Sequence, residues 1–259
     1  MEEFKPEKLR KKKVALVGVG ALGTVIANHL ARVGIGELRL IDRDYVEESN
    51  LQRQVLFNEE DAQRQLPKAI AAMEKLQRIN PSVTLIPHVT HLQPSNAHEL
   101  IAGVDLILDG TDNLETRFLI NDLSIKYNIP WIYGGVIHSR GVSATIIPRV
   151  TPCFRCLFDR PHGAHGQTCD TVGVLSPIVN IVAAFQVAEA LKLLTDSLTV
   201  LRKQMLQINI WNHDLDYLPI ENGINPACPC CQQHKYEFLE QKIDEKLFSQ
   251  LCGRDSIQI

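Results

Sequence analysis

A glycine-rich turn, GVGALG, constrains the fold of this chain more than any other stretch. It lies between a β-rich run at residues 14–17 and a helical pattern from Ala21 to about Val33, and a second strand is expected from Glu37 to Asp42. A strand, a tight turn, a helix and a second strand form a βαβ unit, and such units build a mostly parallel sheet. We therefore predict a Rossmann-like, doubly wound α/β fold.

Each glycine of this turn has a separate task. Gly18 allows the tight turn, Gly20 lets the backbone approach a phosphate, and Gly23 packs the helix on the strand. The N-terminus of the helix offers free N–H groups and the positive end of its dipole to an anion. Asp42 lies 24 residues after Gly18, where a ribose-binding carboxylate belongs. The turn therefore predicts a nucleotide site and leaves the identity of the nucleotide open.

The alternation of strand and helix continues to about residue 135 and then changes. Residues 141–148 follow the preceding strand too closely for a helical crossover, so this strand is expected to be antiparallel. Ser176 to Leu194 is a long, nearly all-apolar helix, which should be buried in the core or at a subunit contact. Two more strands are expected within residues 200–220. The prediction is a mixed sheet with a parallel N-terminal half, antiparallel C-terminal strands and a structural zinc site.

Composition excludes several classes of function. With 259 residues, 45% of them apolar, and a net charge of −3, the chain supports a real core and gives no electrostatic case for binding nucleic acid or an anionic membrane. No apolar run approaches the roughly 20 residues that a membrane helix needs. The charged N-terminus lacks the features of a secretory signal, so the expected location is the cytoplasm.

The cysteines predict a metal site. Cys153 and Cys156 form one CxxC pair, and Cys228 and Cys231 form a second, with 71 residues between the pairs. Four thiolates suit a closed, tetrahedral structural zinc, and a redox CxxC is the alternative. Cys230 lies inside the second pair and is expected to be a bystander.

Polar residues after the second strand do not suit a dehydrogenase. Asn50 and Arg53 lie about ten residues beyond Asp42, and Lys68 begins a later helix. An enzyme that breaks the α–β bond of ATP must hold a triphosphate and stabilise the leaving pyrophosphate, which cationic side chains and a metal ion can do. Asp109 and Asp112 follow a buried strand, at the edge where ligands bind in open α/β sheets. Taken singly, Lys68 could be a solvated charge, and Asp112 or Asn113 a helix N-cap. Arg117, on the helix that follows, is expected to make a surface or first-turn contact.

Taken together, these segments resemble the ThiF/MoeB family, the bacterial relatives of ubiquitin-activating enzymes. The resemblance runs from about Lys13 to Cys231 and is carried by GVGALGT, DRDYVEESNLQRQ, LPKAIAA, DGTDNLETR, TPCFRC, TCDTVGVLSP and CPCC. It implies an ATP-dependent adenylyltransferase that activates the C-terminal glycine carboxylate of a ubiquitin-like sulfur-carrier protein, for thiamine or molybdopterin synthesis. The products would be an acyl-adenylate and pyrophosphate.

The resemblance also implies roles for single residues. Asp42 would hold the ribose, Asn50, Arg53 and Lys68 the triphosphate, and Asp112 a Mg²⁺ ion. It matches Cys169 to a cysteine that some members use covalently in sulfur transfer; a small buried residue is the alternative. The expected cofactors are ATP, Mg²⁺ and Zn²⁺. The expected nucleotide-binding residues are Gly18, Gly20, Gly23, Asp42, Asp44, Asn50, Arg53, Gln54, Lys68, Asp112 and Asn113.

Organisation and partners follow from the same resemblance. Residues 1–231 would form the adenylation domain, with a nucleotide-binding half at about 13–135 and a carrier-binding and zinc part at about 136–231. Residues 232–259 would be an extension of unassigned role. The partner would be a carrier ending in Gly-Gly, with a cysteine desulfurase or rhodanese as sulfur donor, and the protein would be a homodimer. The family's N-terminal Arg-Gln motif is missing, and Arg10 is the candidate to replace its arginine.

Three other functions remain open from the sequence. The chain could adenylate a ribosomal peptide, it could be an NAD-dependent oxidoreductase, or it could be a non-catalytic scaffold. A scaffold would usually lose the phosphate-binding Arg or Lys, which this chain retains.

Overall fold

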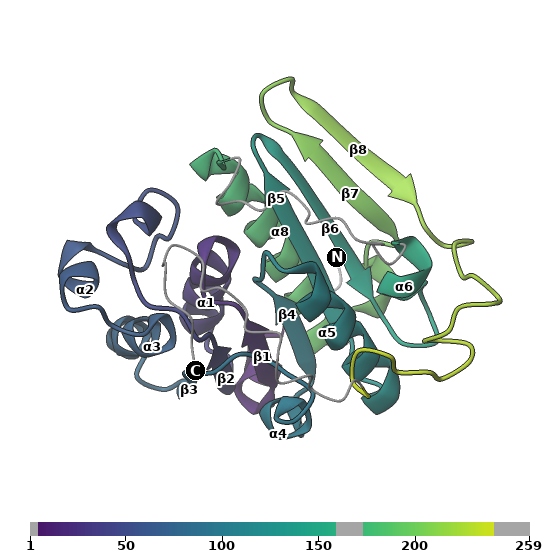
Figure 1. The fold of residues 1–259 in the computed structure, drawn as a ribbon, viewed down its shortest axis with the longest axis horizontal. Coiled ribbons are helices and arrows are strands. Elements are labelled where there is room, and N and C mark those ends of the chain that lie inside the picture. Colours follow the sequence, from purple (N-terminus) through teal and green to yellow (C-terminus); the bar gives the residue numbers. More distant parts are fainter. Residues whose placement is uncertain (1–4, 159–172, 241–259) are drawn as a thin grey trace.

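The strands of the protein form a single continuous mixed sheet. In the computed structural model, which describes residues 5–158 and 173–240, eight strands lie in the order β3-β2-β1-β4-β5-β6-β7-β8 (Figure 1). Their bounds are β1 Lys13–Val17, β2 Glu37–Ile41, β3 Thr84–His88, β4 Leu106–Asp109, β5 Trp131–Ile137, β6 Arg140–Ile146, β7 Gln204–Asn209 and β8 Asp214–Pro219.

The N-terminal half of the sheet is parallel, as predicted. β1 pairs with β2 on one side and with β4 on the other, and the outer strands β3 and β5 are parallel to them. The chain therefore reverses its direction of winding between β1 and β4. In an open α/β sheet a ligand binds at such a point, outside the carboxyl ends of the strands.

The C-terminal strands are antiparallel, which is also as predicted. A two-residue connection joins β5 to β6, and His138 in it has a φ of 53°. β7 and β8 form a second hairpin on the outer edge of the sheet. Because β5 is parallel to β4, the β5–β6 connection lies at the same end of the sheet as the carboxyl ends of β1, β2 and β4.

Helices cover both faces of the sheet. Along the strands successive side chains point to opposite faces, so Leu16 packs in one core with α1, α3 and α8, whereas Ala15 packs in the other with α4, α5 and α6. The bounds of the helices, with 3-10 turns written η, are η1 Pro6–Lys11, α1 Ala21–Val33, η2 Glu48–Asn50, α2 Glu59–Gln63, α3 Lys68–Ile79, α4 Ala97–Ile101, α5 Leu114–Tyr127, α6 Phe154–Leu157, α8 Ser176–Leu194 and η3 Leu198–Val200.

Helix α8 corrects one expectation from the sequence. By length and composition alone its 19 residues could cross a membrane, so the prediction that no apolar run approaches that length is wrong. In the fold, α8 packs against α1, β5 and β6 as a core helix. Its buried Gln186 and Glu189 make polar contacts with neighbouring parts of the chain, as buried polar groups generally do.

Several local features differ from the sequence prediction. The short elements η1, α2 and α6 were not predicted, because each has at most about two turns and shows little periodicity. Helix α3 begins at Lys68, as expected, and Pro67 is its N-cap. Leu9 is fully buried, so part of the charged N-terminal segment belongs to the core. The predictions for Cys169 and for residues beyond 240 lie outside the described residues.

Candidate functional site

The glycine turn brings three backbones into close contact. Gly18 has a φ of +87°, which favours glycine, and a side chain there would meet the Gly110 carbonyl carbon at 2.6 Å. A side chain on Gly23 would collide with the carbonyl of Gly18, and one on Gly110 would collide with the same carbonyl. The first turn of α1 therefore packs directly on β1 and on the loop after β4. The sequence analysis missed the role of Gly110, which depends on a contact distant in sequence.

A cavity of about 460 Å³ opens beside this turn, within the size range of small-molecule sites. We call it the glycine-turn cavity. Of the residues predicted to bind nucleotide, Gly23 packs behind the turn as just described. The remaining predicted residues all line the cavity, namely Gly18, Gly20, Asp42, Asp44, Asn50, Arg53, Gln54, Lys68, Asp112 and Asn113.

The Asp42 carboxylate organises the floor of the cavity. Its Oδ2 accepts a hydrogen bond from Val19 N at 2.6 Å, and its Oδ1 accepts one from Asp44 N at 2.8 Å. Burial raises the pKa of Asp42, since burial disfavours the charged form, while the nearby Lys68 ammonium opposes that shift. Asp42 thus fixes the glycine turn to the end of β2.

Lys68 lies among carboxylates at the start of α3. Its Nζ is 3.2 Å from Asp44 Oδ2, and only 9% of the side chain is exposed. Burial alone would lower the pKa of Lys68, but the carboxylates of Asp42, Asp44 and Asp112 outweigh it and raise the pKa. Lys68 is therefore a buried cation inside the cavity, and the interpretation of Lys68 as a solvated surface charge is wrong.

The second wall of the cavity comes from η2 and the turn after it. Arg53 Nη1 donates to Ser49 O at 3.1 Å, and Asn50 is 8% exposed. Gln54 is 3% exposed, and its Oε1 has no hydrogen-bond partner among the described residues. An orphaned buried polar atom that faces a cavity fits a site for a polar ligand.

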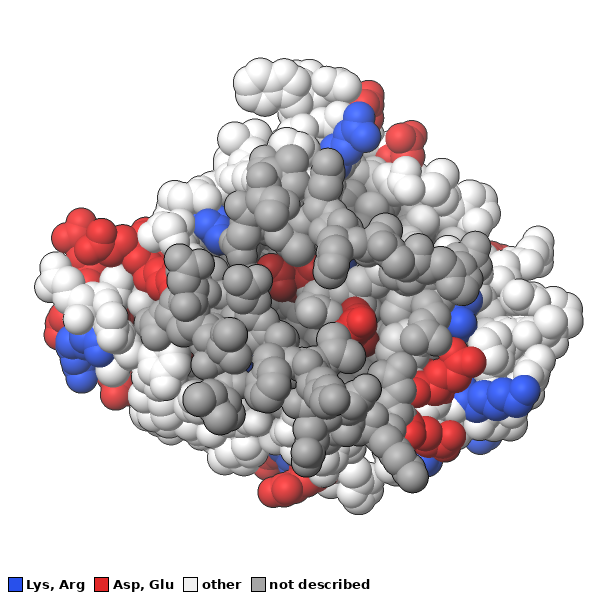
Figure 2. All heavy atoms as spheres, viewed as in Figure 1, with Lys and Arg blue, Asp and Glu red and all other residues white. Residues whose placement is uncertain are grey.

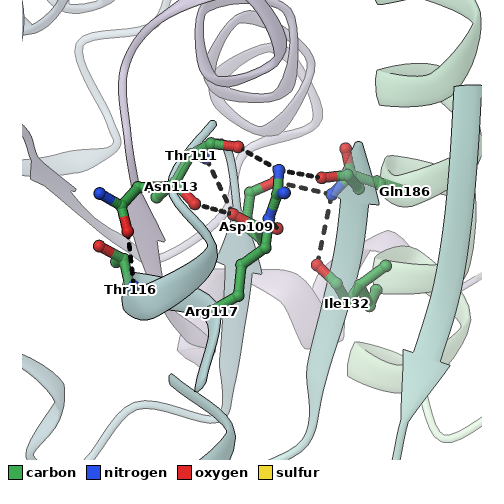
Figure 3. Close-up of polar contacts among 8 residues, drawn as sticks. Asp109, Thr111, Asn113, Thr116, Arg117, Ile132 and Gln186 are labelled. Atoms are coloured by element: carbon green, nitrogen blue, oxygen red, sulfur yellow. Dashed lines mark hydrogen bonds and ion pairs between the residues drawn. The ribbon is translucent and has the colours of Figure 1, made fainter. Parts of the chain in front are cut away.

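The loop after β4 is held by a buried ion pair (Figure 3). Asp109 is fully buried, and its Oδ2 is 2.9 Å from Arg117 Nε. Asp109 Oδ1 accepts hydrogen bonds from the backbone N–H and the hydroxyl of Thr111, and Arg117 also donates to the carbonyls of Thr111 and Gly134. Asp112 follows Thr111 on the same loop and lines the glycine-turn cavity.

The structure decides the roles of Asn113 and Arg117, two residues at the start of α5. Asn113 Oδ1 accepts from Thr116 N at 3.0 Å, so Asn113 is the N-cap of α5, one of the two candidates for that position. Arg117 was expected to make a surface or first-turn contact. Only 12% of the Arg117 side chain is exposed, and it joins α5 to the end of β4 and to the middle of β5.

Gln186 supports the same loop from the opposite side of the sheet. This fully buried residue of α8 donates from Nε2 to Asp109 O at 2.8 Å and to Ile132 O at 3.3 Å (Figure 3). The sequence analysis did not single out Gln186. An uncharged polar residue within a nearly all-apolar helix was the signal that could have found it.

We expect Arg117→Met to lower the free energy of unfolding by about 3–5 kcal/mol, because it leaves the buried Asp109 carboxylate without its cation. Urea denaturation would measure the change. The control is the double variant Asp109→Asn/Arg117→Met, which removes both charges and should lose less stability than Arg117→Met alone. Equal stability of Arg117→Met and the wild type would contradict this account of the loop.

Residues after β3 form a third wall that the sequence analysis missed. Thr90, His91 and Leu92 line the cavity, and the Asn96 amide fixes their loop by donating to His91 O at 2.9 Å. Burial lowers the pKa of His91, and the nearby Arg43 cation lowers it further. A neutral imidazole at this edge suits contact with an uncharged part of a ligand.

The four predicted zinc ligands lie together on the far side of α5. The Sγ atoms of Cys153, Cys156, Cys228 and Cys231 all lie within 4.8 Å of one another, with nearest distances of 3.5 to 3.8 Å. Tetrahedral zinc with Zn–S bonds of about 2.3 Å places sulfurs about 3.8 Å apart. Four converging, largely buried thiols therefore fit a structural zinc ion.

Cys230 is a bystander to the four-sulfur group, as predicted, but it has a structural contact of its own. It is 2% exposed, and Asn121 Nδ2 donates to its sulfur at 3.3 Å. It lies outside the four-sulfur group but ties the second CxxC pair to α5.

Charges on the described surface are mixed. Figure 2 shows both acidic and basic side chains on the described part of the face in view. Arg10, the candidate to replace the family's N-terminal arginine, is exposed in η1 before β1 and does not line the cavity of its own chain.

The family model that matches this sequence is described as the ThiF family, and it covers residues 2–230. The chain belongs to the ThiF family. The fold of this ThiF-family chain agrees with the sequence prediction, because the mixed sheet and the glycine turn expected from the residue pattern both occur in the structure.

Curated relatives extend the assignment along most of the chain. The sulfur carrier protein ThiS adenylyltransferase of Bacillus subtilis (strain 168) is 41% identical over 98% of this chain and 74% of its own length. The SAMP-activating enzyme E1 of Haloferax volcanii is 36% identical over 93% of this chain and 88% of its own length. The sulfur carrier protein adenylyltransferase of Thermus thermophilus is 33% identical over 87% of this chain and 84% of its own length.

Solved structures share the fold at lower identity. A crystal structure of MccB from E. coli with MccA-N7isoASN has a TM-score of 0.75 and 23% identity, over 88% of this chain and 68% of that one. A crystal structure of MccB with ATP has a TM-score of 0.74 and the same identity, over 87% of this chain and 68% of that one. At this identity the likeness establishes the fold alone.

Proposed function

We propose that this ThiF-family protein is an ATP-dependent adenylyltransferase that activates the C-terminal carboxylate of a ubiquitin-like sulfur-carrier protein. One observation carries the proposal: Arg53, Lys68 and Asp112, predicted from scattered motifs, all line one cavity beside the glycine turn. The names of relatives that are 41% and 33% identical support the same activity.

The proposed reaction needs no general base. The carboxylate of the carrier is already an anion at neutral pH. One of its oxygens attacks the α-phosphorus of ATP, a new O–P bond forms, and the bond from the α-phosphorus to the α–β bridging oxygen breaks. Pyrophosphate leaves with the electron pair of that bond, and an acyl-adenylate remains. Alignment and charge neutralisation then account for most of the rate.

Within this reaction each side of the cavity has a role. Asp42 and Asp44 hold the ribose end, and the turn from Gly18 to Gly20 with the N-terminus of α1 faces the phosphates. Asn50, Arg53, Gln54 and Lys68 hold the triphosphate and neutralise the charge that develops on pyrophosphate. Asp112, beside Asn113, holds Mg²⁺, which neutralises phosphate charge when bound.

The carrier needs a docking surface at the cavity end of the sheet, because its tail must reach the cavity. The turn between β7 and β8 lies there, since Ile210 N donates to Ser139 O in the connection between β5 and β6. Trp211 on this turn is 74% exposed, and Leu215 and Tyr217 on β8 are about half exposed. Exposed apolar side chains of this kind suit contact with a protein partner, and we propose that the carrier docks on them.

We expect Trp211→Ala to raise the KM for the carrier by about 10-fold or more, since a tryptophan anchor typically contributes at least 1–2 kcal/mol to an interface. The KM for ATP should not change, because Trp211 does not line the glycine-turn cavity. Steady-state pyrophosphate release with each substrate varied in turn would measure both constants. A carrier KM equal to that of the wild type would contradict this docking surface.

Other parts of the proposal concern partners and location. We propose that the protein is a cytoplasmic homodimer, that a cysteine desulfurase or rhodanese supplies sulfur to the activated carrier, and that Cys169 is a candidate for covalent transfer. The domain division at about residue 135 and at residue 231 also remains a proposal.

The experiment that tests the function is ATP–pyrophosphate exchange with purified carriers of the thiamine and molybdopterin types, each ending in Gly-Gly. Exchange that depends on one carrier supports the proposal and identifies the pathway. Exchange with a short peptide and none with either carrier would favour a peptide-modifying enzyme. Tight binding of NAD without any exchange would overturn adenylation altogether.

A further inference from the structure

Helix α5 connects the glycine-turn cavity to the cysteine cluster. Its N-cap, Asn113, lines the cavity, and Arg117 in its second turn is bound to Asp109 at the end of β4. Asn121 and Asp122 follow four and five residues after Arg117, about one helical turn further along. Both are almost completely buried, Asn121 at 0% and Asp122 at 3% exposed, and both face the cysteine-rich segments.

Asn121 makes one hydrogen bond to each CxxC segment. Its Oδ1 accepts from Phe154 N, inside the first pair, at 2.7 Å. Its Nδ2 donates to the sulfur of Cys230, inside the second pair, at 3.3 Å. The two segments are distant in sequence and together carry all four ligand cysteines, so this single amide joins the two halves of the cysteine cluster.

Asp122 holds the segment that follows the second pair. Its Oδ2 accepts from Phe238 N at 2.8 Å and from Leu239 N at 3.3 Å. The Phe238 ring stacks on Phe118 of α5, with centroids 4.8 Å apart. In Figure 1 this segment, coloured yellow, lies beside α5 and α6. The described start of the C-terminal extension, residues 232–240, is therefore packed onto α5.

We propose that the zinc-bound cysteine cluster sets the position of α5, and through α5 the loop of Asp112 and Asn113, with Asn121 as the positioning residue that joins the two sites. The consequence for nucleotide binding depends on the proposed function, whereas the effect on the loop does not. If the cluster opens, the buried polar groups of Asn121 lose their partners, and a buried group without partners is costly. The helix then shifts or loosens, and Arg117 carries the change to Asp109 and Thr111 in the loop.

The test compares Asn121→Ala with a matched variant at a distant asparagine. Asn80→Ala also removes an amide that donates to a backbone carbonyl, Ala31 O, and accepts from the backbone N–H and the hydroxyl of Ser82. Asn80 lies after α3, at the opposite end of that helix from Lys68. Zinc content, melting temperature, the Kd for Mg·ATP and the hydrogen–deuterium exchange of backbone amides 110–117 would be measured for the wild type and both variants.

We expect that the Asn121→Ala variant, with its zinc retained, binds Mg·ATP about 3- to 30-fold more weakly than the wild type. Hydrogen–deuterium exchange of its backbone amides 110–117 should be faster. Asn80→Ala should leave the Mg·ATP affinity and the exchange at residues 110–117 unchanged, even if its melting temperature falls as much as that of Asn121→Ala. Cys230→Ala, which keeps the four ligand cysteines, is the second variant if Asn121→Ala does not fold, and it should change both quantities in the same direction. Removal of zinc from the wild type by a chelator should speed exchange in the same loop.

Unchanged exchange at residues 110–117 in Asn121→Ala or Cys230→Ala, or in the wild type without zinc, would overturn the proposal. An equal change in Asn80→Ala would overturn it as well, since the effect would then follow global stability. If the wild type itself does not bind Mg·ATP, the proposed function fails, and the exchange data still decide whether the cysteine cluster positions the loop.

Discussion

Replacing Arg53 by alanine is expected to lower carrier-dependent ATP–pyrophosphate exchange by at least about 10³-fold. Arg53 provides a fork of donors in the turn after η2, and both Arg53 and Asp112 line the glycine-turn cavity. A group that stabilises the leaving pyrophosphate acts most strongly when charge develops on it, so the loss should be mainly in kcat. Asp112→Ala should lose a similar amount, because the same charge would no longer be neutralised by a bound Mg²⁺.

The control for Arg53→Ala is Arg64→Ala. Arg64 is on the surface beside Glu60, with 54% of its side chain exposed, and it does not line the cavity. Arg64→Ala should exchange at the rate of the wild type, and all three variants should keep its melting temperature to within a few degrees. Exchange at the wild-type rate in Arg53→Ala or Asp112→Ala would remove these residues from the proposed site.

Replacing Cys153 or Cys231 by serine is expected to remove bound zinc and to lower the free energy of unfolding by more than about 5 kcal/mol. The reason is that the four sulfurs join β6 and α6 to the segment after β8, and three thiols hold zinc much more weakly than four. Metal analysis and thermal unfolding of the same sample would measure both quantities.

Cys230→Ala is the matched control for that loss. It removes a buried cysteine from the same segment but leaves the four-sulfur group intact, so the protein should keep its zinc and most of its stability. A wild-type protein that contains almost no zinc would contradict the metal assignment. Retention of zinc in Cys153→Ser would contradict the choice of ligands.

The parallel half of the sheet could be predicted because its signals are local. A β-rich run before Gly18, helical periodicity after Gly20 and a second apolar run define a βαβ unit within about 30 residues. The antiparallel half followed from length, since the connection before Arg140 is too short for a crossover helix. The same locality explains why the bounds of α8 could be predicted from its apolar run.

The site was predicted unevenly, and the misses share a cause. Asn50, Lys68 and Asp112 occur in motifs that can be read from the chain, and they line the cavity. Arg117 occurs in the motif DGTDNLETR and Gln186 is a polar residue in a nearly all-apolar helix, but neither pattern shows what the side chain contacts. Their roles come from the Asp109 carboxylate at the end of β4 and from backbone carbonyls of β4 and β5, which fold against them from other parts of the chain.

The sequence by itself determined the fold class, the position of the glycine turn, the two cysteine pairs and most of the polar residues that line the glycine-turn cavity. These depend on periodicity, spacing and the chemistry of single side chains, all of which are local. Only the tertiary structure decided that Lys68 is a buried cation among three carboxylates, that Arg117 holds the loop after β4, and that Cys230 is tied to α5. The physical reason is that burial and polar partners belong to pairs of residues distant in sequence, so they exist only once the chain has packed.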